Sequence, residues 1–255
     1  MREDAVASPA RSWILGIDTS GAAGGLALLA VEGERLAARQ LETRARGARA
    51  LLPALDALLR EAGVRREDLA AIGAAIGPGT FTGLRIGLST AKGLALGLGI
   101  PLYGVPSLDA LALEAWLEWR GAPEGEAPRW ILAFRDARQG ELFWALFAAP
   151  ARPDRLPRRE SEDGVDAPPK IPLPAGGPIL AAGSDAPFPS AWEDARVRHA
   201  AFSTAAPAAA RLAREALRRG DPPAPPGLEP RYGRLPRAMT QWGPPPGIDP
   251  GRTLA

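Results

Sequence analysis

The chain has 255 residues, with 31 lysines and arginines against 29 aspartates and glutamates, one histidine and no cysteine. The lack of cysteine excludes disulfides, a thiolate nucleophile and thiolate metal ligands. One histidine excludes every two-histidine metal site, including the H-E-x-x-H helix of metalloproteases. A net charge of +2 gives no strong field for nucleic acid, so we expect any RNA contact to be auxiliary.

The length predicts one large core or two lobes, and the absence of cysteine favours a protein of the cytoplasm. The N-terminus mixes charges and has no apolar run before Trp13, unlike a secretory signal. The longest apolar stretch, 84–100, is interrupted by Arg85 and Lys92 and is shorter than the ~20 residues that span a bilayer. We therefore expect no membrane span.

Periodicity in the first half predicts the order βββαβαβα. The elements are expected at 13–18, 24–31, 35–42, 48–62, 69–76, 82–98, 102–105 and 107–119. Gly63 is placed to end the first helix, and Ser107 is a candidate N-cap for the third.

The second half predicts an abbreviated repeat of the same order. A hairpin is expected from 129–134 and 141–148, then a Pro- and Arg-rich stretch to about 178, a strand at 179–182 and a helix at 205–219. The class is α/β, with an N-terminal lobe at 12–120, a C-terminal lobe at 121–235 and a disordered Pro- and Gly-rich tail at 236–255.

Two loops could bind a nucleotide phosphate. Asp18, Thr19 and Ser20 follow the first strand, where hydroxyl and N–H groups can face a phosphate, although such residues also simply close hairpins. The loop 77–83 precedes a helix N-terminus, which suits anions, but no Gly-Lys-Ser or Gly-Lys-Thr follows, which favours plain turn and cap chemistry.

The helix at 82–98 carries the strongest signal for a binding surface. Small residues recur every four positions, which would let another backbone approach closely, and a helix that is nearly apolar all round should be covered on two sides. A partner protein is one cover, and packing against the 48–62 helix alone is the alternative. The candidate interface residues are Leu51, Leu52, Leu55, Leu59, Arg85, Ile86, Ser89 and Lys92.

No residues are predicted to be catalytic or to bind metal. The hairpin tip Asp136-Ala137-Arg138 with Glu141 supplies no convergent set of ligands and is interpreted as a solvated turn. His199 lies between Arg198 and Ala200 and is expected at the surface.

One string resembles a known family. Residues 77–87, GPGTFTGLRIG, with Lys92-Gly93-Leu94-Ala95, closely resemble the hallmark of the TsaB (YeaZ) family. Further matches lie at 16–20, 51–53, 136–138 with 141, and at Pro230, Tyr232 and Arg234, so the resemblance covers roughly 12–235. The lead-in at 43–47 and the stretch from about Ala149 depart from the family pattern.

The resemblance implies an actin-like ATPase (ribonuclease H-like) fold and a scaffold role. TsaB-like chains lack the metal-binding histidines of their paralogue TsaD, which carries threonylcarbamoyl transfer to the adenosine beside the tRNA anticodon. They pair with TsaD or, alone, with a second copy, and the ATPase TsaE joins the assembly. The chain alone would then bind no cofactor, the complex would use ATP, and tRNA would be met only through the complex.

Two other functions remain open from the sequence. An active actin-like kinase or ATPase would rest on the Asp18 turn, but it needs a second phosphate loop, for which 182–185 is the nearest candidate. A peptidase lacks both a two-histidine metal site and a G-x-S-x-G elbow.

Overall fold

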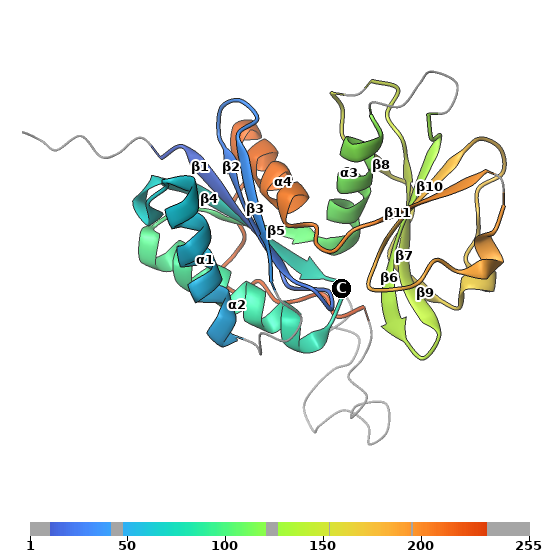
Figure 1. Cartoon of the computed structure of the whole chain (residues 1–255), viewed down its shortest axis with the longest axis horizontal. Helices are drawn as coiled ribbons and strands as arrows, with labels where there is room; N and C mark the ends of the chain where they lie inside the picture. The colour runs from blue at the N-terminus through green and yellow to red at the C-terminus, as the bar shows by residue number, and fades with distance from the viewer. Residues whose placement is uncertain (1–10, 42–47, 121–126, 153, 195, 234–255) are drawn as a thin grey trace, which may run out of the picture.

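The computed structural model describes residues 11–41, 48–120, 127–152, 154–194 and 196–233. The predicted tail at 236–255, the 43–47 lead-in and Arg234 lie outside these residues. Two β-sheets stand side by side with helices between them and on the outer face of the first sheet (Figure 1).

The first sheet has five strands in the order β3-β2-β1-β4-β5. Its strands are β1 (Trp13–Asp18), β2 (Gly25–Ala30), β3 (Leu36–Gln40), β4 (Leu69–Gly77) and β5 (Leu102–Pro106). The first three strands pair antiparallel, and β1, β4 and β5 pair parallel.

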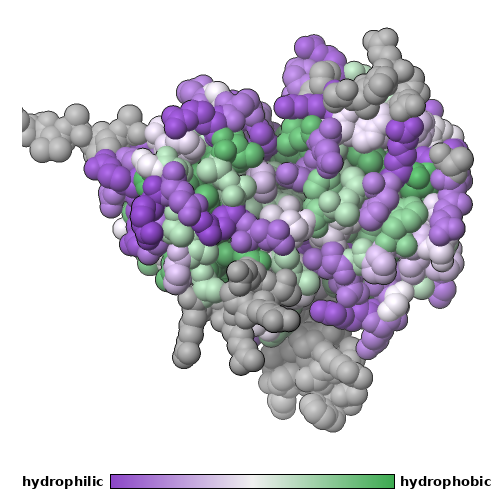
Figure 2. All heavy atoms as spheres, in the orientation of Figure 1, coloured by the Kyte–Doolittle hydropathy of each residue, from purple (hydrophilic) through white to green (hydrophobic). Residues whose placement is uncertain are grey.

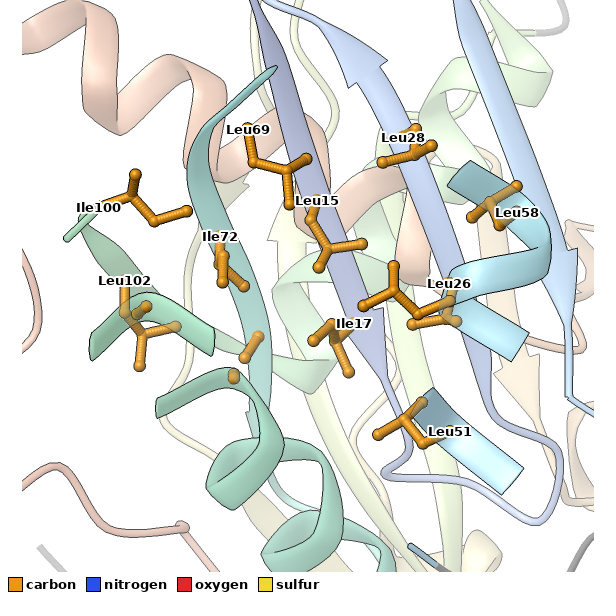
Figure 3. Packing of buried hydrophobic residues seen from close by; sticks show 14 of the residues in the cluster. Leu15, Ile17, Leu26, Leu28, Leu51, Leu58, Leu69, Ile72, Ile100 and Leu102 are labelled. Atoms are coloured by element: carbon orange, nitrogen blue, oxygen red, sulfur yellow. The ribbon is translucent and has the colours of Figure 1, made fainter. Parts of the chain in front are cut away.

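The outer face of this sheet is covered by α1 (Ala48–Ala62) and α2 (Phe81–Leu98), which Gly63 and Gly99 end in the left-handed conformation. Leucines and isoleucines from both layers form one buried cluster, in which Leu51 and Leu58 of α1 point at the strands (Figure 3). A short 3-10 turn, η1 (Arg66–Asp68), joins α1 to β4.

The second sheet has six strands and repeats the order of the first. The path is β11-β10-β6-β7-β8, and β9 also pairs with β7. Its strands are β6 (Trp130–Arg138), β7 (Glu141–Ala148), β8 (Arg158–Arg159), β9 (Gly164–Asp166), β10 (Ile179–Ser184) and β11 (Val197–Ala201). The 3-10 turns η2 (Pro168–Lys170) and η3 (Ser190–Trp192) stand where the first half has α1 and α2, so the repeat is abbreviated.

The two remaining helices lie between the sheets, each against the sheet from the other half of the chain (Figure 1). α3 (Ser107–Trp119) packs mainly on β6 and β10, whereas α4 (Ala206–Arg219) packs mainly on β1, β2 and β4. The backbone of α4 approaches Gly16 and Gly73 so closely that a Cβ at either position would collide with it. The lobe bounds 12–120 and 121–235 stay a prediction, since these helices tie the halves together.

One local prediction is wrong, and three strands were not predicted. Ser107 is not an N-cap: α3 begins at Ser107 itself, and its Oγ accepts a hydrogen bond from the Gly77 N–H at 3.1 Å. The Pro- and Arg-rich stretch 149–178, for which no element was predicted, contains β8 and β9, both of which pair with β7. β11 was also missed. Within the described residues, no helix is long and apolar enough to cross a membrane.

Candidate functional site

The small-residue stripe of α2 faces the chain's own β1–β2 turn. A Cβ at Gly83 would collide with the carbonyl oxygen of Thr19, and one at Gly87 with the Thr19 hydroxyl. The Thr19 Oγ1 donates to the Gly83 carbonyl oxygen at 2.8 Å. The expectation that a partner backbone occupies this stripe is therefore wrong at these two glycines.

Three of the predicted interface leucines lie inside the fold. Leu51, Leu55 and Leu59 of α1 are buried against the sheet and cannot reach a partner. The spacing correctly identified the apolar face of α1, but it could not say that the face covers the chain's own strands. Leu52, on the opposite side of α1, is 48% exposed and remains available.

An exposed face remains on α2. Of the predicted residues, Arg85 and Ser89 are exposed and Ile86 and Lys92 are half-buried. Two large apolar side chains that were not predicted lie on the same helix, Phe81 at 41% and Leu96 at 86% exposure. Arg85, Ser89, Lys92 and Leu96 follow one helical face at steps of four, three and four.

The segment 221–233 returns along α2 and forms one wall of a cavity. The Tyr232 ring stacks on Phe81 with centroids 4.6 Å apart, and its hydroxyl accepts a hydrogen bond from Arg85 Nε at 2.8 Å. Lys92 Nζ donates to the Pro226 carbonyl oxygen at 3.1 Å. A cavity of about 540 Å³ lies between this segment and α2, lined also by Ile86, Leu88, Ser89, Leu228, Glu229 and Pro230.

The predicted phosphate-binding turn is closed on itself. Asp18 and Ser20 are buried, and Asp18 Oδ1 accepts from the backbone N–H of Ser20 at 3.0 Å and from its hydroxyl. Asp18 Oδ2 accepts from the Ala205 N–H at 2.8 Å. Burial alone would raise the pKa of Asp18, but Arg135 and these hydrogen bonds outweigh it and hold the pKa below its ordinary value.

Arg135, which sequence reasoning missed, fills the junction between the two sheets. It comes from β6 and is almost fully buried; its Nη1 donates to Ser20 Oγ, and its Nη2 lies 3.6 Å from Asp18 Oδ2. Its Nε lies 3.9 Å from Asp185 Oδ2, at the end of the predicted second phosphate loop. The one signal in the sequence was an arginine that directly follows an apolar run, residues 130–134, in the strand Trp130–Arg138.

These residues do not fit a magnesium-bound nucleotide. The guanidinium of Arg135 occupies the position between the two carboxylates where a cation would have to lie. Nowhere in the described ranges do three or more histidine, aspartate or glutamate side chains gather as a metal site. The expectation that Asp18, Thr19 and Ser20 face a phosphate therefore finds no support in the geometry.

The remaining polar features are structural. Arg138 N–H donates to Asp136 Oδ1 at 2.8 Å, which closes the hairpin tip locally. His199 lies exposed on β11, as predicted, with its ring 4.9 Å from that of Phe188. Figure 2 shows hydrophilic residues at the rims of both halves and a notch between the halves.

The two sheets have the same strand order, and each of the two helices between them packs on the sheet of the other half of the chain. This arrangement defines an α/β protein of the actin-like (ribonuclease H-like) fold. The family model described as "TsaD: tRNA N6-adenosine threonylcarbamoyltransferase" matches residues 42–152. The structure called YeaZ from Pseudomonas aeruginosa superimposes with a TM-score of 0.69 at 26% identity, over 87% of this chain and 99% of that one. The chain is therefore similar to the TsaB (YeaZ) proteins in both sequence and fold.

Curated relatives match over shorter segments. The tRNA threonylcarbamoyladenosine biosynthesis protein TsaB of Escherichia coli is 40% identical over 97 residues, which are 38% of this chain and 39% of that protein. Its counterpart in Haemophilus influenzae is 33% identical over 132 residues, 52% of each chain. The chain thus spans about half or less of the length of these relatives.

Proposed function

We propose that the chain is a non-catalytic subunit that binds and activates a TsaD-like paralogue in the cytoplasmic synthesis of tRNA threonylcarbamoyladenosine. A TsaE-like ATPase joins the assembly, the complex rather than this chain uses ATP, and tRNA is met through the complex. The names of the E. coli and H. influenzae relatives support the pathway. The exposed face of α2 supports the scaffold role.

That exposed face is the observation that carries the proposal. Leu96 is 86% exposed near the C-terminal end of the helical face that Arg85, Ser89 and Lys92 follow, and no described side chain covers the neighbouring Gly93 or Gly97. A large exposed apolar side chain on the same face as polar and charged residues is typical of an interface core with a polar rim. In the absence of the paralogue, a second copy of the chain is the alternative occupant.

The test substitutes Leu96→Asp and measures the affinity for a purified TsaD homologue by calorimetry. A charge placed in the centre of an interface should weaken binding at least tenfold, about 1.4 kcal/mol. The matched control is Leu156→Asp, an exposed leucine of the second half at 39% exposure, which should bind as the wild type does.

Equal affinity of both variants would place the interface elsewhere on the molecule. If the wild-type chain shows no association, and tRNA modification proceeds without it, the scaffold proposal is overturned.

An active actin-like kinase or ATPase is the second candidate, and it rests on the fold alone. It predicts robust magnesium-dependent ATP turnover by the isolated chain, whereas the scaffold proposal predicts background turnover.

A further inference from the structure

We propose that Arg135 is an internal cation that replaces a bound ligand at the junction between the two sheets and holds the two halves together. The junction carries carboxylates contributed by both halves of the chain. The guanidinium between them supplies the positive charge that a metal ion would otherwise supply.

Four elements converge on Arg135. β6 carries the arginine, the turn after β1 carries Asp18 and Ser20, the end of β10 leads into Asp185, and the N-terminus of α4 contributes the Ala205 N–H to Asp18. The contacts of Arg135 with Asp18 and Ser20 cross from the second sheet to the first. A Cβ at Gly21 would also collide with the Asp185 carboxylate, so the two turns touch directly.

The charges at the junction need this cation. Asp18 is buried and the side chain of Asp185 is only 11% exposed, and a lone buried carboxylate is costly unless it is paired or hydrogen-bonded. Burial raises the pKa of Asp185, while Arg135 acts in the opposite direction. Without Arg135, Asp18 would keep its hydrogen bonds from Ser20 and Ala205, but the like charges would face each other uncompensated.

The same turn also touches α2. The Thr80 N–H donates to the Ser20 carbonyl oxygen at 2.7 Å, and the Thr19 hydroxyl donates to Gly83. The turn is therefore held by α2 on one side and by Arg135 on the other. Arg135 links the second sheet to the helix that carries the proposed partner surface.

The experiment uses the isolated full-length chain and thermal unfolding at neutral pH, so it is independent of any partner. Arg135→Met keeps an unbranched aliphatic stem, although a shorter side chain, and removes the charge; the melting temperature should fall by roughly 10 °C. Hydrogen exchange should speed up in residues 19–24 and 205–208. Arg138 lies on the same strand but is exposed, so Arg138→Met is the control. It should change neither the melting temperature nor the rate of hydrogen exchange.

A second variant separates charge from packing. Arg135→Met with Asp185→Asn removes the opposing carboxylate while keeping an acceptor, so it should recover at least half of the lost melting temperature. If Arg135→Met alone does not fold, folding of the double variant supports the proposal and failure of both overturns it. A melting temperature within 2 °C of the control, a loss that Asp185→Asn does not restore, or stabilisation of the wild type by magnesium ATP would each overturn it.

Discussion

Glu114 is a half-buried acid that carries no ion pair among the described residues. It lies on α3 between the sheets, where its carboxylate accepts a hydrogen bond from the Ala208 N–H in the first turn of α4. Its Oε2 is buried without a hydrogen-bond partner. Burial raises the pKa of Glu114 to about 7, with Arg211 acting in the opposite direction and Glu118 and Asp18 reinforcing the rise.

We predict that Glu114 makes the fold less stable as the pH rises. The folded chain holds this proton up to about pH 7, whereas the unfolded chain releases it near 4.5, so stability falls as the pH rises between these values. This difference between the two pKa values corresponds to a change of about 3 kcal/mol at most in the free energy of unfolding. The free energy of unfolding of Glu114→Gln should therefore exceed that of the wild type at pH 8 but not at pH 4.5, as measured by urea unfolding at both pH values.

Glu162→Gln, at an exposed acid that is not among the groups acting on Glu114, is the matched control and should show no such gain. A Glu114→Gln curve parallel to the wild type at every pH would contradict the assignment of a neutral, half-buried Glu114.

Glu114 and Arg135 mark what sequence reasoning could not reach at this scale. A charged residue within an apolar helix or strand indicates burial, but its partners come from distant parts of the chain. Asp18 was singled out for a phosphate-binding turn or a hairpin, whereas its observed partners Ala205 and Arg135 are fixed only by the packing of α4 and β6.

At the scale of elements, α1 and α2 were predicted to within a residue of their observed bounds. Leucine spacing and the glycines at 63 and 99 define where these helices begin and end. Which face meets which neighbour depends on tertiary packing. The small-residue stripe of α2 was expected to contact a partner but contacts the turn at Thr19, whereas the exposed Leu96 on another face of the helix was not predicted.

The stripe makes a prediction about stability. Gly83→Ala should destabilise the chain by about 2 kcal/mol, because its Cβ would collide with the Thr19 backbone, which cannot move as a flexible side chain could. Gly93→Ala, on the open side with nothing within 4 Å of a Cβ, should stabilise the helix by about 0.5 to 1 kcal/mol.

Urea unfolding at neutral pH measures both changes. Equal effects of the two substitutions, or a stabilising Gly83→Ala, would show that α2 does not rest on the turn as described. Because both glycines lie in the same helix, a difference in helix propensity cannot explain opposite effects of the two substitutions on stability.

At the scale of the whole molecule, the packing of α3 and α4 was the least predictable feature. Both helices were found in the sequence, but nothing in their periodicity shows that each packs on the sheet of the other half. β8 and β9 span two and three residues, too few for a periodic signal, and exist because β7 offers them an edge.

The exchange of helices predicts that the N-terminal half does not fold alone. A chain ending at residue 120 would expose the face of the first sheet that α4 covers, including Ile14, Leu29 and Ala71, and would leave α3 without β6 and β10. We expect it to lack a cooperative thermal transition and to bind the dye ANS. A chain ending at residue 233 keeps every described element and should unfold cooperatively. A sharp transition and dispersed amide resonances in the shorter chain would show instead that the 12–120 lobe is an independent domain and that α4 is dispensable to its core.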